Sequence, residues 1–153
     1  MNAGGAASIT CSSTTELSVG AFTLEDSEPM LFAFYTAPIN SPTILGVEAD
    51  EFRLQFTDAM DADAMANFNG AMTGTFNLAM ETDPNTCSRC LLIRADGGLA
   101  EWSQQSGTIN VMANPITGTL NATLTNVVLA PSAGIALQNS NCYSVTTLTA
   151  TAP

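Results

Sequence analysis

Hydrophobic and polar residues alternate along most of this chain. In the segment EFRLQFT, Phe52, Leu54 and Phe56 fall on one parity, and the positions between them are charged or polar. Successive side chains of a β-strand point to opposite faces, so this alternation predicts strands with one buried and one solvated face. The same alternation recurs at residues 72–80, 108–111 and 117–130.

Clusters of turn-forming residues separate these segments at short intervals. They lie at residues 25–29, 37–42, 81–86, 96–98 and 131–134. About nine or ten short strands separated in this way are typical of an antiparallel β-sandwich, of the jelly-roll or immunoglobulin-like type. The sequence shows neither an internal repeat nor a linker, which indicates a single β-sandwich domain over residues 1–153.

The last predicted strand, CYSVTTLTATA, has an ambiguous pattern. Its threonine content is typical of a strand. Val145 and Leu148 lie on opposite parities, however, so the alternation does not identify its buried face.

One segment, DAMDADAMANFNG at residues 58–70, departs from the alternation. Met60, Ala64 and Phe68 are spaced four residues apart, as on one face of a helix. We therefore expect a short helix near residues 58–69 that covers one end of the sandwich.

The acidic residues of this segment support an alternative interpretation. Asp58, Asp61 and Asp63 offer the carboxylate oxygens that calcium prefers. Their spacing does not match the EF-hand pattern, which needs acids at alternate positions and a glutamate at the end of the loop. Calcium binding by these three residues is thus an alternative to a solvated acidic surface.

Charge composition excludes several classes of function. The chain has three basic residues, all arginine, fourteen acidic residues, no histidine and a formal net charge of -11. A strongly acidic chain without a basic cluster repels nucleic acids and anionic lipid headgroups. Without lysine or histidine, it also lacks a Schiff-base lysine, a P-loop lysine and a Ser-His or Cys-His nucleophile. We therefore expect neither nucleic-acid binding nor most common hydrolase mechanisms.

The apolar segments predict neither a membrane span nor a signal peptide. The longest apolar stretch, MLFAFY, is far shorter than the ~20 residues of a spanning helix. The first segment, MNAGGAASIT, lacks the charged and apolar regions of a signal peptide. An even cysteine count and a polar, lysine-free composition favour an oxidising exterior. We expect a secreted or cell-surface protein in its mature form, with a cytoplasmic location as the alternative.

The cysteines Cys11, Cys87, Cys90 and Cys142 are compatible with three kinds of chemistry. A zinc site with four cysteines usually contains two close pairs, and only Cys87 and Cys90 are close in the sequence. A redox C-x-x-C motif usually lies at the start of a helix, whereas LLIRA after Cys90 predicts a strand. Structural disulfides are therefore the favoured interpretation.

Four cysteines allow three pairings. The favoured pairing joins the CSRC segment to both ends of the chain, with one bond from Cys11 and one from Cys142. The competing pairing joins Cys87 to Cys90 and Cys11 to Cys142. The sequence does not decide between the two.

Two further groups of residues suggest ligand binding or catalysis. Trp102 and Tyr143 are candidates for a platform that stacks on a sugar ring, with core packing as the alternative. Paired carboxylates perform glycoside hydrolysis when they face each other in a cleft. The candidate acids are Glu25 with Glu28, Glu48 with Glu51, Glu81 with Asp83, and Glu101. All lie in turn-like or strand-edge segments, which favours solvated acids and no enzymatic activity.

Five segments carry a resemblance to a group of known proteins. They are GTFNL, TCSRCLLI, SGTINV, GTLNATLTNVVL and CYSV, within residues 74–145. In these segments the chain resembles exported or lipid-anchored, C-x-x-C-containing, β-rich surface proteins of gliding and predatory bacteria. The resemblance covers about half the chain and includes no catalytic motif. It implies a disulfide-stabilised β-domain at the cell surface.

These features lead us to expect an exported, non-enzymatic domain with a structural or adhesive role, working as a subunit of an extracellular assembly. Its partners would be other protein chains, and self-association would proceed by addition of a strand to a sheet edge. A glycan- or calcium-binding module is the first alternative, and a carboxylate-based hydrolase is the second. Calcium is the one cofactor that these alternatives include.

Overall fold

A computed structural model describes residues 10–46, 48–57, 72–138 and 141–153. The described residues are all-β, as expected, with ten strands and four short 3-10 turns. The strands are β1 (Ser13–Glu16), β2 (Ser18–Val19), β3 (Thr23–Glu28), β4 (Phe32–Ser41), β5 (Glu51–Thr57), β6 (Gly74–Asn77), β7 (Arg89–Ala95), β8 (Ala100–Val111), β9 (Leu120–Gly134) and β10 (Asn141–Ala152). The turns are η1 (Leu78–Met80), η2 (Asp96–Gly98), η3 (Pro115–Thr117) and η4 (Ile135–Gln138). The helix expected near residues 58–69 lies outside the described residues.

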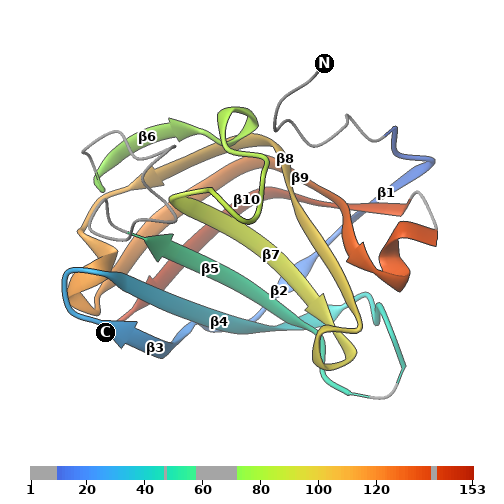
Figure 1. Ribbon diagram of the computed structural model, residues 1–153, viewed down its shortest axis with the longest axis horizontal. Helices are drawn as coiled ribbons and strands as arrows, with labels where there is room; N and C mark the ends of the chain where they lie inside the picture. Colours follow the sequence, from blue (N-terminus) through green and yellow to red (C-terminus); the bar gives the residue numbers. More distant parts are fainter. Residues whose placement is uncertain (1–9, 47, 58–71, 139–140) are drawn as a thin grey trace.

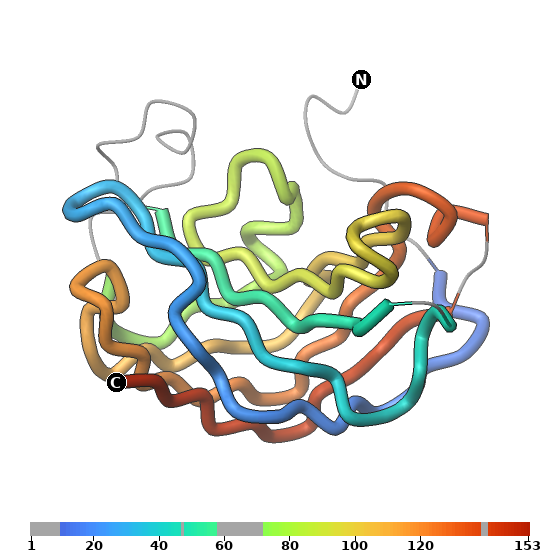
Figure 2. The backbone as a smooth tube through the Cα atoms, turned by 90° about the horizontal axis from the view of Figure 1, so that it is seen from below, coloured from blue at the N-terminus to red at the C-terminus, as the bar shows by residue number. Residues whose placement is uncertain are grey.

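All ten strands belong to one sheet, which curls until it is nearly closed into a barrel (Figure 1, Figure 2). The strand order is β1-β10-β9-β8-β7-β5-β4-β2, with β3 beside β4 and β6 beside β8. Neighbouring strands are antiparallel, except that β1 and β10 are parallel. The expected number of strands is confirmed for the described residues. The two packed sheets of a jelly-roll or immunoglobulin-like sandwich are not confirmed, because the strands form one continuous sheet.

The N-terminal segment connects the two ends of this sheet. β1 pairs with the first half of β10, as far as Glu16 opposite Ser144. After Leu17 the chain leaves β10, and β2 and β3 pair with β4 instead. Among the described residues, the second half of β10, from Thr147 to Ala152, pairs with β9 alone. The barrel is therefore open between β3 and the end of β10.

Large side chains from most of the strands fill the interior. In β5, Phe52, Leu54 and Phe56 point inward and are at most 1% exposed, which confirms the alternation in EFRLQFT. Burial of each such side chain stabilises the fold by about 1.5–3 kcal/mol. Other large buried side chains are Tyr35, Leu78, Leu91, Ile93, Trp102, Ile109, Leu120, Leu124 and Leu129.

Strands β8, β9 and β10 change the face that they bury part-way along their length. In β9 the buried positions change from even to odd at Asn126, whose φ is 50°. Gly107 of β8, with φ of 110°, packs against this bend, where a Cβ would lie 2.6 Å from the Cα atom of Val127. β10 follows the same bend, with Val145 and Ala150 both buried. This bend explains the ambiguous parity of the last strand.

The turn between β8 and β9 covers one end of the barrel. Pro115 and Ile116 in this turn are buried. The Tyr35 hydroxyl donates a hydrogen bond of 2.6 Å to the carbonyl oxygen of Pro115. Burial raises the pKa of Tyr35 to about 12, so the hydroxyl stays protonated and holds the turn against β4.

Candidate functional site

The four cysteines form two disulfides. Cys11 bonds to Cys142 with Cα atoms 5.6 Å apart, and Cys87 bonds to Cys90 with Cα atoms 5.5 Å apart. The favoured pairing, which joined CSRC to both chain ends, is wrong, and the competing pairing is observed. The parallel course of β1 and β10 brings the two terminal cysteines together, while the other two lie in one turn at the start of β7.

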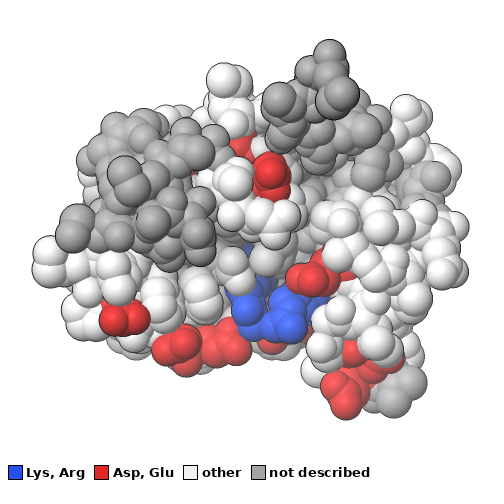
Figure 3. Space-filling view, viewed as in Figure 1, with Lys and Arg blue, Asp and Glu red and all other residues white. Residues whose placement is uncertain are grey.

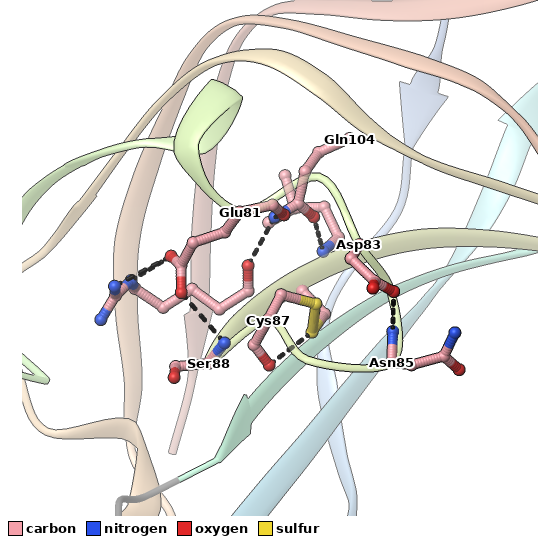
Figure 4. The surroundings of a disulfide bond; sticks show 9 residues. Glu81, Asp83, Asn85, Cys87, Ser88 and Gln104 are labelled. Atoms are coloured by element: carbon pink, nitrogen blue, oxygen red, sulfur yellow. Dashed lines mark hydrogen bonds and ion pairs between the residues drawn. A yellow bond between two sulfur atoms is a disulfide. The ribbon is translucent and has the colours of Figure 1, made fainter. Parts of the chain in front are cut away.

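A buried ion pair holds the turn that contains Cys87 and Cys90 (Figure 4). Glu81 Oε2 accepts a hydrogen bond from Arg89 Nε at 2.9 Å and lies 2.9 Å from Arg89 Nη2. Glu81 Oε1 accepts the N–H of Ser88 at 3.0 Å. Buried charges that are paired and hydrogen-bonded in this way fix one local conformation, because breaking the pair is costly.

Gln104 extends this network from β8 to the turn. Its amide nitrogen donates to the carbonyl oxygens of Glu81 and Arg89, at 2.8 and 2.7 Å, and its amide oxygen accepts the N–H of Leu91 at 2.6 Å. The Arg89 guanidinium also stacks 3.7 Å from the ring centroid of Phe76, within cation–π range. These contacts tie Glu81 to a structural network.

Two arginines and three glutamates form a charged cluster on the outer face of the sheet (Figure 3). Arg53 Nη2 lies 3.0 Å from Glu25 and from Glu51. Arg94 lies 3.2 Å from Glu51 and 3.8 Å from Glu101. Partly exposed ion pairs of this kind contribute about 0–1 kcal/mol each, so their arrangement matters more for surface chemistry than for stability.

A polar recess lies at this charged cluster. Its first part, a hollow of about 250 Å³, is lined by Glu25, Glu48, Ala49, Glu51, Arg53, Arg94 and Gly97. A second hollow of about 270 Å³ adjoins it across Ala49 and Glu51 and is lined in part by Asp50. Asp50 Oδ2 accepts the N–H of Ile44 at 2.7 Å, while Asp50 Oδ1 is buried without a partner among the described residues. The recess contains charges of both signs and has room for a small polar ligand.

The aromatic platform predicted at Trp102 and Tyr143 is contradicted by burial. Trp102 is 2% exposed, and its indole N–H donates to the carbonyl oxygen of Asn141 at 2.9 Å. The two rings meet edge to face, with centroids 5.3 Å apart. Burial raises the pKa of Tyr143, and the negative charge of Asp50 raises it further. The pair belongs to the core, so neither ring offers a face to a sugar.

The predicted calcium ligands Asp58, Asp61 and Asp63 lie outside the described residues. In residues 10–46, 48–57, 72–138 and 141–153, no group of three or more His, Cys, Asp or Glu side chains is placed to hold a metal ion. No helix in this part of the chain is long and apolar enough to cross a membrane.

The second half of β10 has a sheet edge that is unpaired among the described residues. The N–H of Thr146 points toward β1, because a carboxylate oxygen of Glu16 accepts it at 2.7 Å. Beyond the bend the pattern shifts by one residue. The carbonyl oxygen of Asn121 in β9 accepts the N–H of Met112 on the β8 side, so the next residue, Ala122, faces β10 and its partner Ala150 directs its N–H and C=O groups to β9. The N–H and C=O groups of Thr147, Thr149 and Thr151 therefore point to the side away from β9. No described residue pairs with them there, and this half of β10 has no charged side chain. An uncharged, unpaired edge is a template for another strand.

The free edge of β3 differs from that of β10 in charge. β3 pairs with β4 alone among the described residues, and Glu25, Asp26 and Glu28 are exposed along it. Charged side chains on an edge strand oppose its pairing with further strands. Of these two edges, the one on β10 is therefore the better template.

Glu16 and the β10 edge are the features that reasoning from the sequence missed. The carboxylate of Glu16 also accepts hydrogen bonds from the hydroxyls of Ser144 and Thr146, at 2.8 and 3.1 Å. The available signals were a lone acid at the end of the polar run SSTTE and the uncharged run TLTATA near the other end of the chain.

Comparison with protein-family models found no match, and searches of curated proteins and of solved structures found none. The function must therefore be inferred from the described residues themselves.

Proposed function

We propose that this protein is an exported, non-enzymatic structural or adhesive domain of the cell surface that joins another protein chain by strand addition. The observation that carries the proposal is the uncharged edge of β10 from Thr147 to Ala152, with which no other described strand pairs on the side away from β9. Backbone N–H and C=O groups at such an edge bind an extended strand through main-chain hydrogen bonds. The domain would be one subunit of an extracellular assembly.

Three features support export and a structural role. The two disulfides suit an oxidising compartment. The exposed faces of β10 and β1 consist mainly of threonine and serine, so another protein chain would meet uncharged hydroxyl groups there. Of the candidate catalytic acids, Glu25, Glu51, Glu81 and Glu101 are in ion pairs with arginine. A carboxylate held by arginine is poorly placed to transfer protons.

Hydrogen exchange with a strand-donor peptide tests strand addition. The probe is a synthetic peptide that copies Thr146–Ala152, TTLTATA, and the readout is amide exchange along β10. We expect the peptide to slow exchange at Thr147, Thr149 and Thr151, whose N–H groups face the free edge. Exchange at Leu148 and Ala150 should change little, because their N–H groups face β9. Unchanged exchange at the three edge amides at saturating peptide would overturn the proposal.

A second candidate function, glycan binding, is favoured by the polar recess at Glu51. Sugars are bound through charged and hydroxyl groups that fix their orientation, and the recess offers carboxylates, guanidinium groups and the hydroxyls of Thr23 and Thr36. A glycan array probed with the protein and with Arg94→Ala tests it. Binding that disappears in the variant supports this candidate, and absence of any binding removes it.

A further inference from the structure

We infer that the partner at the β10 edge is a second copy of this chain, paired antiparallel with β10 about a twofold axis at Ala150. This inference rests on the proposed function, because it names the strand that would occupy the free edge. A twofold contact uses the same surface patch on both copies, so the patch must be complementary to itself.

The backbone of β10 meets this requirement. With Ala150 opposite its own copy, Thr149 lies opposite Thr151 of the second copy. In an antiparallel ladder, opposed residues whose N–H and C=O groups point toward each other exchange two hydrogen bonds. Both threonines direct these groups to the free edge, because Leu148, Ala150 and Ala152 direct theirs to β9. This register therefore forms two such pairs, one on each side of the twofold axis.

The side chains meet the requirement as well. The same register places Thr149 opposite Thr151 of the second copy, and both threonines are exposed on the outer face. Directly opposed threonines in an antiparallel pair stabilise the sheet through contacts between their side chains. Ala150 and Ala152 are small and point inward, so close approach of the two strands brings no bulky groups together.

Charge favours β10 over β3 as the site of self-pairing. Each copy has a net charge of -11, so two copies repel each other at long range. Pairing of β3 with itself would add direct opposition among Glu25, Asp26 and Glu28. Pairing through β10 brings no charges into opposition within the ladder, and salt screens the remaining repulsion. Self-association should therefore strengthen as ionic strength rises.

The chain itself closes the rest of this edge. β1 covers β10 as far as Ser144, and the carboxylate of Glu16 caps the N–H of Thr146. Capping stops at the point where the self-complementary run begins. The remaining edge has the length of a short strand, from Thr147 to Ala152.

Sedimentation of charge variants tests the partner and the register together. Thr149→Glu with Thr151→Glu would place acids opposite acids in this register and should raise the dissociation constant at least tenfold. Thr149→Lys with Thr151→Glu would place lysine opposite glutamate and should retain the dimer. The control, Thr108→Glu with Asn110→Glu, adds the same negative charge at exposed positions of β8, which is flanked by β6 and β9. It should retain the dimer at high salt.

Each outcome has a distinct meaning. A monomeric wild-type protein at millimolar concentration and high salt would overturn the inference. Strand addition would survive if the TTLTATA peptide still protected the edge amides, so the two failures are distinguishable. A wild-type dimer that tolerated both glutamates would place the contact elsewhere. Loss of the dimer in the lysine–glutamate variant would overturn the antiparallel register, because a parallel pairing would oppose like charges.

Discussion

Glu16 reaches across from the end of β1 to Thr146 of β10. Its carboxylate oxygens accept the N–H of Thr146 at 2.7 Å and the hydroxyl of Thr146 at 3.1 Å. The side chain thereby replaces the backbone carbonyl that a longer β1 would have provided. Glu16 thus marks the boundary between the closed and the open part of the barrel.

This contact predicts a pH dependence of stability. Partial burial raises the pKa of Glu16, but the hydrogen bonds from Thr146 and Ser144 outweigh it, so the pKa is lowered overall. A carboxyl group whose pKa is lower in the folded state stabilises the fold above its unfolded pKa of 4.5, and this stabilisation is lost as pH falls through the folded pKa. The unfolding midpoint of Glu16→Gln should therefore lie below that of the wild type at pH 7. The two midpoints should approach each other in acid, and a constant gap between pH 7 and acid would contradict the prediction.

Gly107 is predicted to be irreplaceable at the bend shared by β8 and β9. A Cβ there would lie 2.6 Å from the Cα atom of Val127 and 2.7 Å from the carbonyl oxygen of Asn126, and the φ of 110° is itself unfavourable for other residues. Gly107→Ala should lower the free energy of unfolding by about 3 kcal/mol or more. Gly46→Ala is the matched control, because a Cβ at Gly46 has open space around it. Urea denaturation that gave equal stability for both variants would show that the bend is not constrained.

The two disulfides should differ in their contribution to stability. Cys11 and Cys142 are separated by 131 residues, and Cys87 and Cys90 by 3. In the chain-entropy model, bonds closing loops of these sizes stabilise the fold by about 5 and about 2 kcal/mol. Replacing the terminal pair by alanine should therefore lower the unfolding free energy more than replacing the C-x-x-C pair. Each double variant is the control for the other, and equal losses in guanidinium denaturation would refute the ordering.

The strands of the fold were easier to predict from the sequence than their closure. Alternation in β5 identified Phe52, Leu54 and Phe56 as buried because each strand there has one face on the core. Alternation failed in β10 because a bend at Asn126 of the neighbouring strand changes the buried face. The single curled sheet was missed because the pattern of one strand does not reveal which strands become its neighbours.

The candidate site was less predictable than the fold. The pairing of Cys11 with Cys142 depends on a parallel contact between β1 and β10, which nothing in the local sequence specifies. A single tryptophan is compatible with both a platform and core packing, and the burial of Trp102 decides it. The free edge of β10 exists because β1 stops pairing at Glu16, which is a tertiary property.

The β3–β4 turn offers a stabilising substitution. Met30 has φ of 68° and is exposed, at the third position of a turn in which Leu31 donates its N–H to the carbonyl oxygen of Glu28. Left-handed backbone conformations cost a residue with a Cβ roughly 1–2 kcal/mol, and glycine avoids this cost. Met30→Gly should therefore raise the unfolding free energy by about 0.5–1 kcal/mol. Met112→Gly, at an exposed position without positive φ, should lower it, and thermal denaturation of both variants checks the difference.

Replacing one member of the buried Glu81–Arg89 ion pair should lower the free energy of unfolding more than replacing both members. Glu81→Gln keeps an oxygen for the N–H of Ser88 but removes the carboxylate charge that lies against the buried Arg89 guanidinium, which should cost about 3–5 kcal/mol. Adding Arg89→Met removes the buried guanidinium charge and retains an apolar contact with Phe76, so the double variant should be more stable than Glu81→Gln alone. Denaturant titration of the wild type, both single variants and the double variant gives the coupling energy. Additive losses, with no recovery in the double variant, would show that the charges of this pair do not act together.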